Sequence, residues 1–295
     1  MPELPDVAIY VEALTDRIAG RRLERVNLLS PFVLRSYDPP IDAIVGATVN
    51  GVRRVGKRLV IGFDGDLFLV IHLMIAGRLR WREKGQKPGV GPKMILASFD
   101  FAHGTLLFTE ASSKKRASLQ LVCGETGVRA VDPGGIEPLD ATLDEFRAAI
   151  VRENHTVKRA LTDPHLLSGI GNAYSDEILH AAKISPLKLT RALAPEEMEA
   201  LYLAVRDTLT LWVNRLRQQS GGRFPEKVTP FRDEMAVHGR YKLPCPVCGA
   251  PVQRIVYASN ECNYCARCQT GGRLLADRSL SRLLRDDWPK SIDDL

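Results

Sequence analysis

The sequence has 295 residues, 45% hydrophobic and 26% charged, an ordinary composition for a soluble globular chain of about two domains. Lysine and arginine number 41 against 35 aspartate and glutamate, which gives a net charge of +6. No stretch approaches the roughly 18 apolar residues of a membrane span, and the N-terminus lacks the basic and apolar regions of a signal peptide. We therefore expect a cytoplasmic protein without a membrane partner.

The N-terminal half is predicted to form one helix followed by short strands. Residues 4–19 repeat apolar side chains at helical spacing, and Pro5 suits a first helical turn. From about 22 to 125, short β-type segments alternate with Gly, Pro and Asp. Several short strands at this spacing predict a sandwich or a barrel.

The C-terminal half is predicted to be helical up to a cysteine-rich end. Residues 131–140 form a turn-rich linker, and a long amphipathic helix covers 195–219 before a Gly-Gly pair. Residues 222–236 are predicted to be an irregular loop. The last segment, 237–295, holds five of the six cysteines and a helix-like tail that we expect to pack against the body.

Basic residues cluster in three short segments of the first half. They are RRVGKR (53–58), RLRWREK (78–84) and SSKKR (112–116). Clusters of this kind suit a polyanionic partner, most simply nucleic acid. Charge alone favours this interpretation no more than it favours a solubilising surface.

The spacing C-x2-C-x16-C-x2-C predicts a zinc ribbon. Its cysteines are Cys245, Cys248, Cys265 and Cys268. Each pair places two sulfurs on one side of a tight turn, and two pairs complete the tetrahedron that zinc prefers. One structural zinc ion is expected to supply much of the folding energy of so small a ribbon. Cys262 is an alternative ligand that the spacing disfavours.

Residues 168–172, SGIGN, form a glycine turn between two helical segments. Two glycines let the backbone turn sharply and approach another molecule closely. Asn172 opens the second helix, whose free N–H groups can hold a phosphate, and its amide can add a hydrogen bond. The alternative is a plain helix hairpin with Asn172 as N-cap.

An N-terminal PELP, the GIGN turn and the four-cysteine ribbon, in this order, resemble the formamidopyrimidine-DNA glycosylase and endonuclease VIII family of DNA repair enzymes. The likeness extends over nearly the whole chain and includes RRVGKRL (53–59), HLMIAGRL (72–79) and GRYKLPCPVCG (239–249). The resemblance implies damaged DNA as the partner, in the bacterial cytosol and nucleoid.

The fold that the resemblance implies is of the α+β class and has three domains. A catalytic domain with an N-terminal helix and a β-sandwich covers 1–130. A helix–two-turn–helix DNA-binding domain covers 143–236, and a zinc finger with its tail covers 237–295. Because each chain is expected to hold a whole site, we predict a monomer.

The resemblance also gives a role to the first residues. Removal of Met1 exposes Pro2, and an α-amino group has a pKa near 8 against roughly 10.4 for lysine, so part of it is unprotonated at neutral pH. In the family this nitrogen attacks C1′ of a damaged nucleotide, displaces the base and forms an iminium that drives elimination of phosphate. Glu3 matches the acid that protonates the deoxyribose ring oxygen. An ordinary helix lead-in is the alternative.

Further matches assign roles to other residues. Asp6 stands where the family usually has Glu, a second carboxylate for proton handling. Lys57 matches a hairpin lysine that contacts phosphate beside the lesion. Asn172, preceded by Gly171, matches a phosphate-binding asparagine. Lys158 is a candidate phosphate contact, with a solvated helix face as the alternative.

The sequence departs from the family in the residues that find damage. Ile75 takes the position of a Met wedge that fills the gap left by the extruded base, and Met74 replaces a glycine. Either side chain could fill that gap, so this departure is mild. Residues 112–117 replace a segment that carries an Arg and a Phe, so the aromatic wedge is lost and three cations remain, Lys114, Lys115 and Arg116.

A third departure is in the finger loop, where Asn260 stands in place of an Arg that grips phosphates. Base extrusion from a duplex costs a few kcal/mol, and wedge residues offset part of that cost. We therefore expect a preference for single-stranded, bubble, bulky, cross-linked or abasic substrates. The predicted function is a bifunctional DNA glycosylase and AP lyase acting on oxidised or otherwise damaged bases. The alternative is a damaged-DNA-binding protein with AP-lyase but little base-excision activity.

Overall fold

The computed structural model describes residues 1–229, 231–257, 260–276, 282–284 and 289–294. The chain divides into two compact units, one of residues 1–134 and 212–229 and one of residues 135–211 and 230–295. Helix α6 (Pro195–Ser220) contributes to both units. Among the described residues, no helix has the length and apolar character that crossing a membrane requires.

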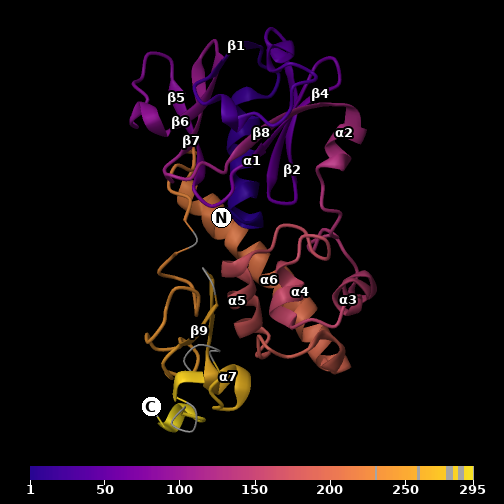
Figure 1. Cartoon of the computed structure of the whole chain (residues 1–295), viewed down its shortest axis with the longest axis vertical. Helices are drawn as coiled ribbons and strands as arrows, with labels where there is room; N and C mark the ends of the chain where they lie inside the picture. The colour runs from indigo at the N-terminus through magenta and orange to yellow at the C-terminus, as the bar shows by residue number, and fades with distance from the viewer. Residues whose placement is uncertain (230, 258–259, 277–281, 285–288, 295) are drawn as a thin grey trace. The chain divides into compact units, whose positions relative to one another are not determined.

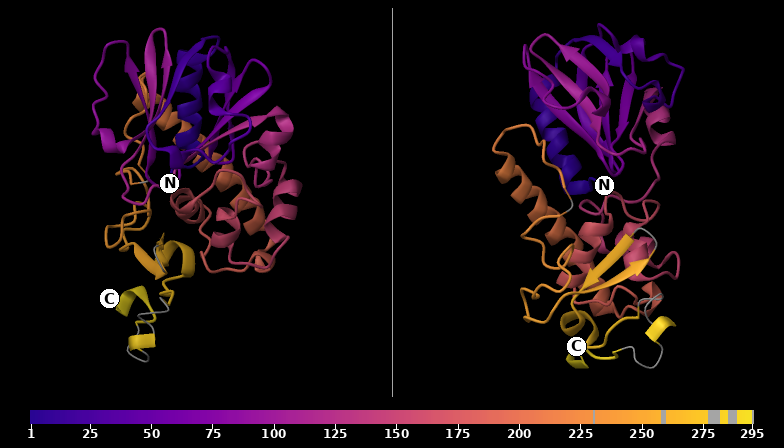
Figure 2. Two further views of the ribbon diagram at one scale, coloured as in Figure 1. Left: turned by 45° about the horizontal axis from the view of Figure 1, so that its top comes forward. Right: turned by 60° about the vertical axis from the view of Figure 1, so that its left-hand side comes forward.

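The first unit is a sandwich of two antiparallel four-stranded sheets with helix α1 (Leu4–Ile18), drawn in indigo and purple in Figures 1 and 2. The strand order is β1-β6-β7-β5 in one sheet and β2-β3-β4-β8 in the other. The strands are β1 (Leu23–Leu28), β2 (Val49–Val55), β3 (Arg58–Phe63), β4 (Leu67–His72), β5 (Gly77–Glu83), β6 (Ile95–Phe101), β7 (Gly104–Glu110) and β8 (Ser118–Cys123).

The core of this unit lies between the sheets and includes the apolar stripe of α1. Val7, Tyr10 and Leu14 of that stripe are fully buried with inward side chains of both sheets. Helix α2 (Gly124–Ala130) covers the outer face of the second sheet, where Val128 packs with valines of β3 and β4. Burying one helical stripe and the facing sides of two sheets is the main source of stability here.

The second unit is mostly helical and ends in a small ribbon. Its elements are α3 (Leu143–Val151), α4 (Val157–Thr162), α5 (Asn172–Ala181), the first part of α6, β9 (Gln253–Tyr257), β10 (Asn260–Tyr264) and α7 (Ala266–Thr270). A capping box starts α3, where Thr142 and Glu145 satisfy each other's backbone N–H groups. Strands β9 and β10 pair antiparallel, from Asn260 opposite Tyr257 to Tyr264 opposite Gln253.

Short 3-10 helices complete the described elements. They are Pro31–Val33, Ile41–Ile44, Pro92–Met94, Thr190–Ala192 and Ile292–Asp294. The predicted α+β fold is confirmed, with α1 ending one residue earlier and α6 one residue later than the sequence pattern indicates. The predicted helical tail falls mostly on residues outside those described, whereas Leu274 and Leu275 before it are non-helical and buried in the ribbon core.

Candidate functional site

The first residues of the chain are buried and held by a carboxylate. Pro2 is buried, Glu3 is 3% exposed, and Glu3 occupies the N-cap position of α1. Oδ2 of Asp6 accepts the backbone N–H of Glu3 at 3.0 Å. Asp6, predicted as a proton-handling group, therefore fixes the backbone that carries Glu3 and places negative charge at a helix N-terminus, where it is favourable.

Charged groups from three elements surround the N-terminal amine, which Met1 carries in this structure. The pKa of this amine is lowered, mainly by burial; Glu3 opposes the shift, Arg78 and Lys57 add to it, and Asp6 opposes it. Burial also lowers the pKa of Lys57, which lies in the turn between β2 and β3, while Glu3 opposes that shift. The amine, Glu3, Asp6 and Lys57 are thus brought together.

Two residues at this site were missed by the sequence reading. Arg78 on β5 acts electrostatically on the amine. His72 ends β4 opposite Arg58 of β3, and its pKa is lowered to about 4 by burial, then by Arg58 and Lys57. At neutral pH this imidazole is therefore uncharged. A signal was present for both, because His72 and Arg78 lie within the family-like HLMIAGRL segment.

The turn between β4 and β5 carries the predicted wedge residues. Leu73 is buried, whereas the side chain of Ile75 is 63% exposed. Met74 has φ of 52°, in the left-handed region that favours glycine. The turn is tight, because a Cβ added at Gly77 would lie 2.2 Å from the carbonyl oxygen of Leu73. The structure therefore presents Ile75, and it places Met74 in a backbone conformation suited to glycine.

The cationic segment 111–117 is folded around a buried carboxylate that the sequence reading did not single out. Glu110, 1% exposed, accepts the backbone N–H groups of Arg116 and Ala117. Lys115 donates to the carbonyl of Glu110. Lys114 and the side chain of Arg116 are exposed. Glu110 thus determines the shape of the loop, and Lys114, Lys115 and Arg116 are all exposed at its surface.

In the second unit, Asn172 begins α5 as predicted, and its side chain faces the ribbon. Its Nδ2 donates to the backbone carbonyl of Glu261 in β10 at 2.8 Å. Gly171 is the N-cap residue of α5, so Asn172 is the first residue of the helix instead of the predicted N-cap alternative. The side chain of Asn260, at the start of the same strand, lies outside the described residues.

Lys158 is 5% exposed, so the solvated helix face considered for it is wrong. Its Nζ lies 2.5 Å from Oδ1 of Asp176 and donates to the carbonyl of Asn172 at 2.8 Å. Oδ2 of the same aspartate lies 2.7 Å from Nδ1 of His238. An ammonium committed to a buried carboxylate would have to break that pair to reach a phosphate, so the geometry argues against the predicted phosphate contact of Lys158.

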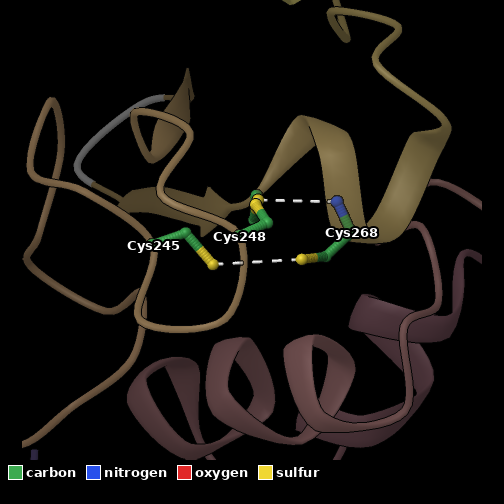
Figure 3. A group of neighbouring side chains, drawn as sticks. Cys245, Cys248 and Cys268 are labelled. Carbon is green, nitrogen blue, oxygen red and sulfur yellow. Dashed lines mark hydrogen bonds between the residues drawn. The ribbon is translucent and has the colours of Figure 1, made fainter.

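The four predicted zinc ligands converge in the ribbon. The sulfurs of Cys245, Cys248, Cys265 and Cys268 all lie within 4.8 Å of one another. The Sγ atoms of Cys245 and Cys268 are 3.9 Å apart (Figure 3), and those of Cys248 and Cys265 are 3.4 Å apart. Zn–S bonds of about 2.3 Å place the sulfurs of a tetrahedron about 3.8 Å apart, so the site fits one zinc ion.

The other cysteine of the ribbon and one histidine bear on the assignment of this zinc site. Cys262, the alternative ligand, is buried outside the group of four, and burial raises the pKa of its thiol. Nε2 of His180 in α5 lies 3.3 Å from Sγ of Cys245. A histidine at this distance is placed to donate to a metal-bound thiolate. The closed four-cysteine set leaves no position for water, which is typical of a structural site.

Comparison with known proteins agrees with this arrangement. Three family models match: the formamidopyrimidine-DNA glycosylase N-terminal domain over residues 1–115, the H2TH domain of the same enzymes over 135–221, and the zinc finger found in FPG and IleRS over 242–271. Sandwich, helical domain and zinc finger, with a buried Pro-Glu N-terminus, define an enzyme of the DNA glycosylase class.

Individual relatives support the same classification. The formamidopyrimidine-DNA glycosylase of Heliobacterium modesticaldum is 32% identical over 282 residues, which cover 91% of this chain and 100% of the relative. A formamidopyrimidine-DNA glycosylase-like protein of Mycobacterium tuberculosis is 38% identical over 164 residues, 56% of this chain and 100% of the relative. Lactococcus lactis Fpg, solved in complex with abasic-site DNA, has a TM-score of 0.80 at 25% identity, covering 91% and 99%. The chain belongs to the formamidopyrimidine-DNA glycosylase family.

Proposed function

We propose that this chain is a bifunctional DNA glycosylase and AP lyase that uses the nitrogen of Pro2 as its nucleophile. The observation that carries the proposal is the buried N-terminal cluster. The N-terminal amine, which Met1 carries in this structure, has a pKa lowered by burial, and the buried Pro2 precedes Glu3, whose backbone N–H is held by Asp6. Once Met1 is removed, we propose that the amine of Pro2 has the same buried surroundings. A depressed pKa raises the fraction of free amine at neutral pH, which is the form that attacks carbon.

The proposed reaction proceeds in two stages at the sugar. After Met1 is removed, the free secondary amine of Pro2 attacks C1′ as the C1′–N bond to the damaged base breaks. The base leaves with the bonding electron pair, and the proton that the nitrogen of Pro2 loses neutralises it. Glu3 donates a proton to the ring oxygen, the ring opens, and the amine and C1′ form an iminium. The iminium acidifies the C2′ proton; loss of that proton expels the 3′ phosphate, and a second elimination can expel the 5′ phosphate.

Lys57 and Asn172 are proposed to hold backbone phosphates. Lys57 lies close enough to the N-terminal cluster to act electrostatically on it. The amide of Asn172 has two N–H donors, so it can keep its bond to the carbonyl of Glu261 and offer the second donor to a phosphate. We assign Lys158 to a structural role instead, because its ammonium is buried against Asp176.

We further propose that the preferred DNA is single-stranded, bubble-like or distorted, bound by a monomer. Ile75 is the exposed apolar side chain of the β4–β5 turn, and the 112–117 segment offers Lys114 and Arg116 but no aromatic ring. A branched aliphatic side chain without an aromatic partner replaces base stacking poorly. Extrusion of a base from an intact duplex should therefore be slow.

Trapping with borohydride tests the proposal. Mature protein mixed with abasic single-stranded DNA and borohydride should form a covalent adduct, because reduction fixes the iminium. Absence of an adduct would exclude the amine mechanism. Glu3→Gln serves as the matched control: it should still trap preformed abasic DNA but lose release of damaged bases. Intact protein that traps abasic DNA yet releases no base from a panel of lesions would instead support the damaged-DNA-binding alternative.

A further inference from the structure

One guanidinium links three parts of the first unit near the N-terminal amine. Nε of Arg78 donates to the carbonyl of Val228 at 2.7 Å. Its Nη1 donates to the carbonyls of Ile75 at 3.0 Å and Gly77 at 2.6 Å. A planar guanidinium with five fixed donors can hold several carbonyls at once, which a lysine cannot do. Arg78 therefore joins the β4–β5 turn to the segment that follows α6.

That segment, residues 222–229, is held on the sandwich by further contacts. Glu226 pairs with Arg80 at 2.8 Å and also with Arg82. The two arginines follow Arg78 at every second position of β5, so all three lie on one face of the strand. The ring of Phe224 packs 5.8 Å from that of Tyr10, and Val228 is 7% exposed within the core. These contacts hold the segment against the first unit. Because Arg78 binds both this segment and the carbonyl of Ile75, it holds the β4–β5 turn in place.

Arg78 is also one of the charges that act on the amine. The charged groups that act on the amine are Glu3 at the N-cap of α1, Asp6 of α1, Lys57 of the β2–β3 turn and Arg78 of β5. The two acids favour the ammonium form, and the two cations favour the free amine. Burial lowers the pKa of the amine that Met1 carries, Glu3 opposes that shift, and Arg78 adds to it.

We propose that Arg78 is a positioning residue for the proposed reaction: its guanidinium braces the β4–β5 turn against the 222–229 segment and keeps a positive charge in the part of the first unit that carries the N-terminus. The inference rests on the proposed function. It assigns two separable tasks to one side chain, a geometric task that needs the fork of donors and an electrostatic task that needs only the charge. Lysine keeps the charge without the fork, and glutamine removes the charge.

The experiment measures the pH dependence of borohydride trapping on single-stranded abasic DNA, with cleavage of duplex abasic DNA as the second readout. The rate should rise with pH as the amine loses its proton. Arg78→Gln should move the midpoint upward by about half a unit to one unit, since a cation that disfavours the ammonium form is removed. Arg78→Lys should keep the wild-type midpoint but cleave duplex DNA at least about fivefold more slowly.

The matched control is Arg80→Gln. Arg80 lies on the same face of β5 as Arg78 but pairs with Glu226, so its loss should leave the midpoint unchanged. A purely structural role for Arg78 would lower thermal stability and leave the midpoint where it is. An unshifted midpoint in Arg78→Gln would overturn the electrostatic part, and wild-type duplex cleavage by Arg78→Lys would overturn the geometric part, even if Arg78→Gln failed to fold. If the wild-type protein forms no adduct, the proposed function itself fails.

Discussion

Lys158 and Asp176 form a buried ion pair, with Nζ 2.5 Å from Oδ1. The same Nζ donates to the backbone carbonyl of Asn172, the first residue of α5. The exposed fractions of the two side chains are 7% and 0%. The pair connects α4 to α5, and through Oδ2 it also reaches His238. A lysine that the sequence offers for phosphate binding therefore supports the turn that carries Asn172.

Lys158→Met should destabilise the protein without changing how DNA binding depends on salt. Removing one partner of a buried pair leaves an uncompensated charge, so we expect the free energy of unfolding to fall by about 3–5 kcal/mol. Urea unfolding measures this loss. A phosphate contact would instead lower the slope of log affinity against log salt by about 1, with little loss of stability. Lys57→Met is the comparison that should reduce the slope.

Met74→Gly should stabilise the protein, because Met74 occupies the left-handed region at φ 52°. An L-residue there costs the folded state roughly 1–2 kcal/mol, which glycine would avoid. Glycine also has more conformational entropy in the unfolded state, which offsets part of that gain. We expect a net gain of up to about 1 kcal/mol in thermal or urea unfolding. Gly77→Ala, at the first residue of β5 after this turn, should be strongly destabilising, since its Cβ would collide with the carbonyl of Leu73. Equal effects of the two changes would contradict this explanation.

Cys265→Ser should release zinc and unfold the ribbon, because two paired knuckles are needed to complete the tetrahedron. Metal content of the purified protein and thiol reactivity measure the loss. Cys262→Ala is the matched control, because Cys262 lies outside the group of four sulfurs; it should retain one zinc ion per chain. Loss of zinc from the control and not from Cys265→Ser would reverse the assignment.

His72 should make stability depend on pH below neutrality. Its pKa is lowered to about 4 in the folded chain, against 6.5 in the unfolded chain, so the unfolded state binds more protons between these values. Stability is therefore fully present above pH 6.5 and declines as pH falls towards 4. The full shift corresponds to about 3 kcal/mol, and because His72 is only half-buried we expect about 1–2 kcal/mol. His72→Gln should flatten this part of the unfolding curve; an unchanged slope would exclude His72 as the cause.

The sequence predicted best those features in which local spacing sets the geometry. Two CxxC pairs determine a tetrahedron by themselves, and the apolar stripe of α1 determines which face is buried. The first prediction is confirmed because the two cysteines of each pair are close in sequence. The second is confirmed because the apolar residues of α1 recur with the period of the helix. The observed ends of α1 and α6 differ from the predicted ends by one residue each, which is within the usual uncertainty of helix boundaries.

The sequence could not show which charged residues are buried, because burial depends on partners far along the chain. Lys158 lies on a short helix where a solvated face was the alternative, yet its side chain is 7% exposed because Asp176, 18 residues away, pairs with it. Glu110 ends an ordinary strand and acquires its role only when segment 111–117 folds back over it. Asp176 occurs in a polar stretch of α5 whose burial follows from packing against the ribbon.

The most direct measurement compares strand cleavage by mature protein, beginning at Pro2, with cleavage by protein that keeps one uncleaved residue before Pro2. Both forms should bind abasic DNA with similar affinity, which a gel-shift titration verifies. Only the form that begins at Pro2 should cleave, because the extended form has an amide in place of the nucleophilic amine. Equal cleavage rates for the two forms would show that Pro2 is not the nucleophile.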